Sequence, residues 1–400
     1  MFTVTHFAHL RHVIARRAAS FAFLPVVVGT LLVTPAHGET IKSQKHSFTV
    51  STLATGLNHP WSLVFLPDAS MLISERNGGL KHVSTDYVVT NVNGLPDKLN
   101  YSGQGGLLGL ALSPDFETSK KIYLAYAEKG DYRKSGTSVV SATLDEDTRT
   151  GARSLSNITQ IFQQYPKLAG GRHFGGRLLA TEQHLYIALG DRGNRDKAQQ
   201  NDSHIGTLVR LNLDGSIPED NPFLSDPTAK PEIFSFGHRN IQGMTLDNDG
   251  TSLWTHEHGP QGGDELNLIT SGTNYGWPTI TYGVNYVTGS SIGQGTTAEG
   301  MAQPVEYWVP SIAPSGLDMV KGKAFPNWQG DILLGSLKFG LLVRLEIEDT
   351  QGKYVVAQEK LLDGKFGRIR DVVEGPDGLI YLLTDSSDGA VLRLSPAPIN

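Results

Sequence analysis

The sequence predicts an all-β protein, a six-bladed β-propeller, and two observations carry this prediction. First, the 400-residue chain holds 45 glycines and 20 prolines, and no segment has the periodicity of a long amphipathic helix. Second, one unit recurs along the chain: a polar turn rich in Pro, Asp, Asn or Gly, followed by a strand of Leu, β-branched or aromatic residues. A chain of this length can bury a sizeable core, in two domains or in one large all-β domain.

The recurring turn-and-strand unit is found six times in the sequence. Its copies are FLPDASMLISER (65–76), 112–127, 178–191, 246–259, 325–337 and 374–394. A spacing of about 50 to 80 residues is typical of four-stranded blades with insertions. Closure of the ring would pair the final strand, 390–394, with a strand from the N-terminal end. An array of β-sandwiches would also explain the strands, but not the regular return of the unit.

The N-terminus has the layout of a secretory signal peptide. Arginines precede an apolar stretch at 18–33, and the small residues Ala36 and Gly38 follow it. We therefore expect residues 1–38 to be a signal peptide and residues 39–400 to form a single propeller domain. The alternative is a retained N-terminal membrane anchor. We expect an exported, soluble periplasmic protein whose mature chain has no stable membrane insertion.

Composition excludes several classes of partner and site. The net charge is −6, and no basic stripe occurs outside the extreme N-terminus, which argues against nucleic acid as a partner. The chain has no cysteine, so it forms no disulfide and no thiolate metal site. This is compatible with an oxidising compartment without requiring one.

One histidine, His173, lies in the glycine-rich string GGRHFGGR. Flanking glycines allow a ligand to approach the backbone closely, and a histidine there can act as a general base near neutral pH. The alternative is a loop histidine bonded to a carbonyl group. Asp191 follows a strong apolar strand and could orient an imidazole, or it could cap a turn.

An oxygen-rich turn lies in THEHGPQGGDELN, residues 255–267. Its candidate ligands are Gly259, Pro260, Asp264 and Glu265. Carboxylates and the exposed carbonyls of irregular turns suit calcium, although the spacing is not that of an EF-hand, and a plain acidic turn is the alternative. His256 and His258 alternate on one strand and would suit zinc, but no further well-spaced histidine and no cysteine accompany them.

Cations occur at four separate places beside turns or strands. These are Arg239, Lys338, Arg368 and Arg370, and the last two share a strand face because side chains alternate with period two. Together they could clamp a polycarboxylate or polarise a carbonyl oxygen, although each alone could be a surface charge. Gln104 and Asn240 are candidate functional amides. Aromatic surface near the turn comes from Tyr275, Trp277, Tyr282 and Tyr286, for which packing is the alternative role.

Read in order, these strings resemble one known family. From Gly56 to Leu394 the chain carries GQGGLLGLALSPDF, GRHFGGRLL, LYIALGDRG, GHRNIQG, EHGPQGGDELNLI, NYGWP, GSLKFG and GRIRDV. The chain resembles the soluble pyrroloquinoline-quinone (PQQ) dependent aldose sugar dehydrogenases, relatives of soluble quinoprotein glucose dehydrogenase. The resemblance implies a six-bladed propeller that oxidises an aldose to a lactone by hydride transfer to calcium-bound PQQ.

The resemblance also implies residue roles. His173 would take the proton from the anomeric hydroxyl of the sugar, Asp191 would partner it, and Arg239 would complete the catalytic set. The implied cofactor-binding positions are Gln104, Arg239, Asn240, Ile280, Thr281, Tyr282, Tyr286, Lys338, Arg368 and Arg370. The carbonyls of Gly259 and Pro260 would hold the Ca²⁺ that binds PQQ. Glu265 and the backbone of Tyr275 would hold a second, structural Ca²⁺.

The sequence also departs from the pattern of this family. Arg172 precedes His173 where soluble glucose dehydrogenase has an acid that helps to bind sugar, and the substrate loops and dimer contacts of that enzyme are shortened here. We therefore expect a monomer with a broad aldose range, which passes electrons to an unidentified acceptor.

Two other functions stay open. One is a calcium-dependent propeller hydrolase, such as a lactonase, which would have no use for several cations around a polycarboxylate. The other is a non-enzymatic propeller that serves as a binding module, for which neither converging glycine loops nor a histidine–acid pair is expected.

Overall fold

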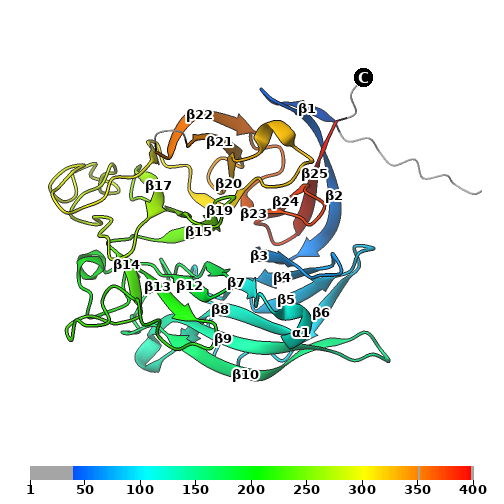
Figure 1. Cartoon of the computed structure of the whole chain (residues 1–400), viewed down its shortest axis with the longest axis horizontal. Coiled ribbons are helices and arrows are strands. Elements are labelled where there is room, and N and C mark those ends of the chain that lie inside the picture. Colours follow the sequence, from blue (N-terminus) through cyan, green and yellow to red (C-terminus); the bar gives the residue numbers. More distant parts are fainter. Residues whose placement is uncertain (1–38, 350–351, 398–400) are drawn as a thin grey trace, which may run out of the picture. The chain divides into compact units, whose positions relative to one another are not determined.

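Strands make up nearly all of the regular structure in this computed structural model, which describes residues 39–349 and 352–397 (Figure 1). In that part of the chain there is one short α-helix, α1 (Phe116–Ser119), and three 3-10 turns, η1 (Asp131–Arg133), η2 (Arg195–Gln199) and η3 (Pro326–Trp328). The all-β prediction is confirmed. The predicted signal peptide, 1–38, lies outside the described residues. Within them, no helix has the length and apolarity needed to cross a membrane.

The strands form antiparallel groups, and in every group except the last the strands are consecutive along the chain. Two groups share an eight-stranded sheet: β3 (Pro60–Phe65), β4 (Met71–Glu75), β5 (Gly79–Val83) and β6 (Val89–Asn93), then β7 (Leu107–Leu112), β8 (Lys121–Lys129), β9 (Ser135–Glu146) and β10 (Arg153–Gln163). The two halves are joined into one sheet where β10 pairs in parallel with β6, through Arg153 with Val92 and Ser154 with Asn93.

Three four-stranded sheets come next in the chain. The first has β11 (Leu178–Ala180), β12 (His184–Ala188), β13 (Thr207–Asn212) and β14 (Ile233–Phe236). The second has β15 (Ile241–Leu246), β16 (Leu253–Glu257), β17 (Asp264–Ile269) and β18 (Glu306–Trp308). The third has β19 (Pro314–Met319), β20 (Ile332–Ser336), β21 (Leu342–Glu348) and β22 (Tyr354–Leu361).

The last sheet joins the two ends of the described chain. It orders β1 (Thr40–Lys42), β2 (Ser47–Leu57), β25 (Gly389–Pro396), β24 (Ile380–Thr384) and β23 (Ile369–Glu374). β2 pairs antiparallel with β25, for example through Val50 and Leu394, so the expected pairing of the final strand with an N-terminal strand is present. The blue β2 and the red β25 accordingly lie side by side in Figure 1.

The first strands of the groups contact one another in a closed cycle. β3 contacts β7, which contacts β11, and the contacts continue through β15, β19 and β23 back to β3. Each group is antiparallel, so the start of its first strand and the end of its second strand lie at the same edge. Residues just before a first strand and just after a second strand are therefore brought to one side of this cycle.

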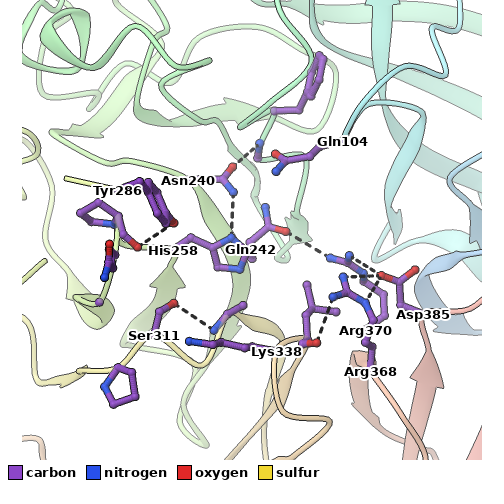
Figure 2. Close-up of a pocket in the computed structure, with 18 of the residues that line it drawn as sticks. Gln104, Asn240, Gln242, His258, Tyr286, Ser311, Lys338, Arg368, Arg370 and Asp385 are labelled. Atoms are coloured by element: carbon purple, nitrogen blue, oxygen red, sulfur yellow. Dashed lines mark hydrogen bonds and ion pairs between the residues drawn. The ribbon is translucent and has the colours of Figure 1, made fainter. Parts of the chain in front are cut away.

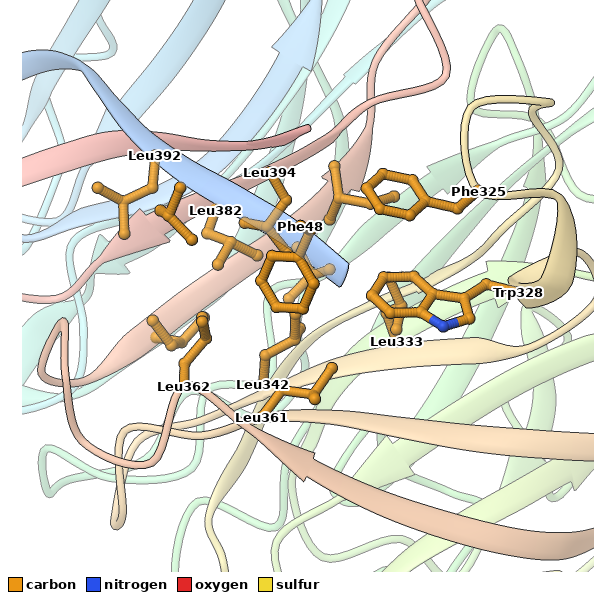
Figure 3. Close-up of a cluster of buried hydrophobic side chains, with 14 of the residues drawn as sticks. Phe48, Phe325, Trp328, Leu333, Leu342, Leu361, Leu362, Leu382, Leu392 and Leu394 are labelled. Atoms are coloured by element: carbon orange, nitrogen blue, oxygen red, sulfur yellow. The ribbon is translucent and has the colours of Figure 1, made fainter. Parts of the chain in front are cut away.

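Apolar faces between neighbouring groups form the core. Strands β4, β16, β20 and β24 are buried at every position, whereas the outer strands β10 and β22 alternate with exposed residues. Figure 3 shows one such layer, where Phe48 and Leu394 of the last sheet pack with Leu342 of β21 and Trp328 of η3. Burial of these apolar side chains is the main contribution to the stability of the fold, and it fixes the positions of neighbouring sheets.

Candidate active site

A cavity of about 880 Å³ opens at the edge where first strands begin and second strands end. Every strand group contributes to its lining, for example through Gln104 just before β7, Asn240 just before β15 and Asp385 just after β24 (Figure 2). Of the residues singled out in the sequence, those that line it are Gln104, Asn240, His258, Pro260, Tyr286, Lys338, Arg368 and Arg370. Seven of the predicted cofactor or metal positions therefore converge on one cavity.

The predicted base and its acid partner form a buried pair beside the cavity. His173 Nδ1 lies 2.6 Å from Asp191 Oδ1, and the two residues are 9% and 1% exposed. Because a carboxylate can only accept, Nδ1 carries the proton and the lone pair of the neutral ring is on Nε2. Gln104, which lines the cavity, accepts a 2.7 Å hydrogen bond from the backbone N–H of His173. The pair is thus tied to the cavity wall.

Electrostatics keep this pair in its neutral-base form. Burial lowers the pKa of His173 below its usual value, the Asp191 carboxylate opposes this, and the guanidiniums of Arg239 and Arg172 add to the lowering. Burial alone would raise the pKa of Asp191, but hydrogen bonds from His173 and from the Gly193 N–H outweigh it, and the pKa falls. At neutral pH the pair is therefore an ionised carboxylate and a neutral imidazole.

The loop that carries His173 adopts backbone that glycine favours. His173 itself has a positive φ of 53°, and Gly175 has 64°. A Cβ on Gly190 would lie 2.2 Å from the His173 carbonyl oxygen, so only glycine permits the close approach. Arg192 donates to the carbonyls of Arg172 and Gly170 and fixes the loop from behind. The string GGRHFGGR thus serves to hold the imidazole at the cavity wall.

Two arginines that line the cavity share one carboxylate (Figure 2). Asp385 Oδ2 accepts hydrogen bonds of 3.0 Å from Arg368 Nη2 and 3.1 Å from Arg370 Nη2, while Oδ1 lies 2.8 Å from His59 Nδ1. Burial alone would raise the pKa of Asp385, but Arg370 and the hydrogen bonds from His59 and Arg368 lower it well below its usual value. The carboxylate is therefore ionised and orients both guanidiniums.

The lining carries an excess of positive charge. Its charged members are the cations Arg76, Lys338, Arg368 and Arg370 and the carboxylate Asp385. Lys338 forms no salt bridge with any residue in the described ranges, and burial lowers the pKa of His258 to about 4, so that this histidine is neutral at pH 7. A ligand with several carboxylates suits this cavity, because its four cations outnumber the single carboxylate of Asp385.

Arg239 and Asn240 link the base to the oxygen-rich turn. Arg239 is buried, and its Nη1 donates a 3.0 Å hydrogen bond to the His258 carbonyl at the start of that turn. Asn240 Oδ1 accepts a 3.1 Å hydrogen bond from the Gly175 N–H, two residues after His173. Burial lowers the pKa of Arg239, and the nearby Asp191 carboxylate opposes this. Because a guanidinium stays protonated in proteins, the residue places a positive charge near His173.

Asp264 organises the oxygen-rich turn. Its Oδ1 accepts a 2.8 Å hydrogen bond from the Gly259 N–H, and its Oδ2 accepts 2.8 Å bonds from the Ile312 and Ala313 N–H groups. Because these donors occupy the carboxylate, it holds the turn rather than facing the cavity. The Pro260 carbonyl lies at the cavity and accepts a 2.9 Å hydrogen bond from the Tyr286 hydroxyl. Carbonyl oxygens in such a place are ligands that calcium accepts.

Glu265 lies opposite Glu257 across the β16–β17 pairing. Burial, reinforced by the Glu257 charge, raises the pKa of Glu265 well above its usual value. The neighbouring Asn267 Oδ1 is buried and has no hydrogen-bond partner. Two carboxylates and an unpaired amide oxygen are chemistry that a cation would stabilise. Tyr275 is close, since its ring stacks on His238, which in turn bonds Glu257.

Metal binding by side chains alone is not supported in the part of the chain that the structure describes. There, no group of three or more His, Cys, Asp or Glu residues is placed to hold a metal ion. His256 faces the Gly316 carbonyl and His258 the Pro314 carbonyl, so the two histidines considered for zinc each have a backbone partner. A metal at the turn would therefore depend on backbone and amide oxygens.

Four predicted cofactor positions do not line the cavity, namely Arg239, Ile280, Thr281 and Tyr282. Ile280 and Thr281 are buried, with backbone N–H groups bonded to Gly276 and Gly295. The Tyr282 ring stacks on Tyr307 with centroids 3.8 Å apart, and its hydroxyl donates to Gln303. The structure therefore brings Tyr286 of this segment to the cavity, but not its three predecessors.

Sequence reasoning missed several lining residues, chiefly Trp61, Gln242, Ser311 and Asp385. The guanidiniums of Arg177 and Arg370 lie 4.5 and 6.0 Å from the centroid of the Trp61 ring. Gln242 Oε1 accepts a hydrogen bond from Arg370. A positional signal exists for Asp385, because it follows a second strand as Asp191 and His258 do. Trp61, inside the first strand β3, carries no comparable signal.

These features define a class of protein: a β-structured enzyme scaffold with a cation-lined cavity for an anionic cofactor and a buried histidine–carboxylate pair at its wall. The comparisons with known proteins agree with this class. Residues 57–393 match the family described as Glucose / Sorbosone dehydrogenase, and the chain belongs to that family. The resemblance stated from the sequence motifs is confirmed.

Known relatives cover almost the whole described chain. The aldose sugar dehydrogenase YliI of Escherichia coli is 43% identical over 355 residues, which are 87% of this chain and 92% of that protein. A crystal structure of the E. coli aldose sugar dehydrogenase in its apo form has a TM-score of 0.82 at 40% identity, covering 88% of this chain and all of that one (100%). The PQQ-bound form of a Streptomyces coelicolor aldose sugar dehydrogenase has a TM-score of 0.71 at 28% identity, with 87% and 98% covered.

The paired arginines predict a pH-dependent loss of stability in Asp385→Asn. Because the folded-state pKa of Asp385 lies below the ordinary carboxyl value of about 3.9, its stabilisation is present above that pH and fades below it. We expect Asp385→Asn to lower the free energy of unfolding by about 3 kcal/mol at pH 7. Urea denaturation between pH 7 and pH 3.5 should show the difference from wild type shrinking below pH 4.

The matched control is Asp388→Asn in the same loop, whose carboxylate only accepts from the Gly56 N–H at the surface. It should change the free energy of unfolding by less than about 0.5 kcal/mol. A cost for Asp385→Asn that is constant over the whole pH range would contradict the assigned role of this carboxylate.

Proposed function

We propose that the protein oxidises the C1 hydroxyl of aldose sugars to lactones, with PQQ, bound through Ca²⁺, as the hydride acceptor. The observation that carries this proposal is the buried His173–Asp191 pair beside a cavity whose lining has four cations and one carboxylate. The named activity of the relatives adds to it, since the E. coli protein is an aldose sugar dehydrogenase and the Streptomyces structure contains PQQ.

The lining chemistry fits PQQ. PQQ carries three carboxylates, and Lys338, Arg368 and Arg370 lie on one side of the cavity to receive them. The planar indole of Trp61 and the amide of Gln242 add a flat, partly polar wall between the cations. Gln104 and Asn240 would add amide hydrogen bonds, and Tyr286 would add an aromatic edge.

Calcium fits the turn beside these cations. The carbonyls of Gly259 and Pro260 would hold one Ca²⁺ at the cavity, with cofactor oxygens completing its shell. A second Ca²⁺ would be bound by Glu265, Asn267 and the backbone of Tyr275. A positive charge there would favour the ionised form of Glu265, whose pKa is raised, and would give the unpaired Asn267 oxygen a partner. Its role would be structural, since Glu265 and Tyr275 do not line the cavity.

The residues of this chain supply binding and proton transfer. When bound, PQQ supplies the acceptor for the hydride that leaves C1 of the sugar. His173 Nε2 takes the proton of the C1 hydroxyl, and the Asp191 carboxylate stabilises the imidazolium that forms. Arg239 holds a positive charge near the reacting end, where negative charge develops on the acceptor oxygen. The sugar loses one hydride and one proton, which makes the C1 carbon a lactone carbonyl.

The wider setting belongs to the same proposal. The cyclic contacts of the first strands and the β2–β25 pairing support a six-bladed propeller formed by residues 39–400. The sequence of residues 1–38 supports export to the periplasm by a signal peptide. We propose a monomer that passes electrons to a separate acceptor. Arg172 beside the base favours a broad aldose range over a strict glucose preference.

Reconstitution tests the proposed function against its two rivals. The purified mature protein is assayed with PQQ and Ca²⁺ for dye reduction by an aldose, and without PQQ for lactone hydrolysis. We expect dye reduction that requires both PQQ and Ca²⁺ and is lost on chelation. Lactone hydrolysis without PQQ would support the hydrolase instead, and inactivity in both assays without PQQ binding would support a binding module.

Replacing the base should abolish turnover while sparing cofactor binding. We expect His173→Gln to lower kcat at least a hundredfold, because general-base catalysis contributes about 10²–10⁴. The Kd for PQQ should stay within about threefold of wild type, because His173 does not supply a cation to the cavity. His184→Gln, a histidine on β12 that does not line the cavity, is the matched control. Turnover near the wild-type rate would remove His173 from the role of base.

Removing one cation should weaken PQQ binding. Arg368→Ala deletes a guanidinium at the cavity, and a charge-assisted pair of this kind is worth about tenfold to a hundredfold in affinity. The control is Arg153→Ala. Arg153 lies on β10 away from the cavity, and its guanidinium pairs with His82 on β5 and Glu146 on β9, so the Kd for PQQ should be unchanged. Equal PQQ affinity in wild type and Arg368→Ala, measured by fluorescence titration, would place the cofactor elsewhere.

A further inference from the structure

Asp191 accepts hydrogen bonds on both of its carboxylate oxygens. Oδ1 receives His173 Nδ1 at 2.6 Å and the Gly193 N–H at 2.7 Å. Oδ2 receives one donor among the described residues, the indole Nε1–H of Trp277, at 2.8 Å. Since Asp191 is almost fully buried, loss of this donor would leave a charged oxygen without a partner or water.

Trp277 is itself held in place by its surroundings. Its ring packs with Ala198 and Ile292, and the Arg239 guanidinium lies 5.3 Å from the ring centroid. Its backbone N–H donates to the Gly237 carbonyl at 2.9 Å, and its carbonyl accepts from Gln199 at 2.8 Å. The indole N–H is therefore preorganised and aimed at the acid that orients the base.

The neutral character of this donor matters for the chemistry. A cation on Oδ2 would neutralise Asp191 and weaken its attraction for the imidazolium that forms when His173 takes a proton. An indole N–H satisfies the oxygen and fixes the plane of the carboxylate, yet leaves its negative charge to act on His173. The carboxylate plane in turn decides which imidazole nitrogen carries the proton.

We propose that Trp277 is a positioning residue for the His173–Asp191 pair: its indole N–H fixes the Asp191 carboxylate, so that Nδ1 of His173 stays protonated and Nε2 is the proton acceptor. This inference rests on the proposed function for its kinetic consequences. Its structural part, the fixed tautomer of His173, does not depend on which reaction the base serves.

The first test is Trp277→Phe, which keeps an aromatic side chain but replaces the indole by a smaller phenyl ring that has no N–H donor. With PQQ and Ca²⁺ bound, kcat should fall about tenfold, while KM for the aldose and Kd for PQQ stay within about twofold. Trp254→Phe is the matched control, because Trp254 is equally buried but its Nε1 has no partner, and it should leave kcat unchanged. A kcat for Trp277→Phe equal to that of the control would overturn the proposal.

A double-mutant cycle tests whether Trp277 acts through Asp191. In an Asp191→Asn background, Trp277→Phe should cost less than twofold in kcat, because the carboxylate on which it acts is already gone. A further tenfold loss in that background would show an independent role and overturn the proposal.

Nitrogen-15 spectra of the imidazole separate this inference from the proposed function. In PQQ-free wild type and Trp254→Phe, we expect His173 to be the Nδ1–H tautomer. In PQQ-free Trp277→Phe, we expect a mixture of the two tautomers. The signals of His173 are assigned by their loss in His173→Gln. An unchanged single tautomer in Trp277→Phe would overturn the inference even if the enzyme oxidises aldoses. If no aldose is oxidised, the spectra still decide the role of Trp277.

Should Trp277→Phe fail to fold, the wild-type indole supplies the readout. Its Nε1 proton should resonate downfield and move upfield in Asp191→Asn, where the acceptor becomes neutral. No movement of that proton would mean that Trp277 does not donate to Asp191 in solution, and would overturn the inference.

Discussion

The pairing of β2 with β25 is the constraint on which the rest of the structure depends. It joins a strand near the start of the described chain to the last one, and it lets β23 contact β3 so that the contacts among first strands form a closed cycle. Because each group is antiparallel, the cycle turns one edge of every group toward the same cavity. Side chains almost 300 residues apart in the chain, such as Gln104 and Asp385, meet for this reason alone.

Charge within the cavity is only partly balanced, and this imbalance defines what it can bind. Asp385 neutralises part of the charge of Arg368 and Arg370, and Lys338 has no ion-pair partner in the described ranges. Lys338 and Arg368 are exposed and can pair with an anionic ligand, whose binding would stabilise the folded protein. Beside the cavity, burial keeps His173 neutral, whereas hydrogen bonds from His173 and the Gly193 N–H keep Asp191 ionised against the effect of burial. This is the state that a proton acceptor needs.

Sequence reasoning succeeded where local chemistry carries the information. Glycines around His173 predicted a tight loop, and the left-handed backbone of His173 and Gly175 is its structural counterpart. The all-β class and the strands followed from turn residues and β-branched runs. Reasoning failed where the third dimension decides: Trp61 and Gln242 look like ordinary strand residues, and Tyr282 looks like its neighbour Tyr286, yet one stacks on Tyr307 and the other reaches the cavity.

The role of Asp264 shows the same limit from another side. Its place in an acidic turn suggested a cation ligand, but both of its oxygens are used by backbone N–H groups of that turn and of residues 312–313. Trp277 shows the reverse, since packing was a sufficient account from the sequence, whereas its N–H meets the acid of the catalytic pair. In both cases the hydrogen-bond partner lies far along the chain, at residues 312–313 for Asp264 and at Asp191 for Trp277, and no local sequence pattern predicts it.

The most direct test of the central claim is the absorption spectrum of the PQQ- and calcium-loaded protein on anaerobic addition of an aldose. The account predicts conversion of the oxidised cofactor spectrum to that of the reduced quinol, in one equivalent per bound PQQ. A loaded protein whose spectrum does not change with any aldose would contradict it, and would leave a cofactor-binding protein with a different substrate.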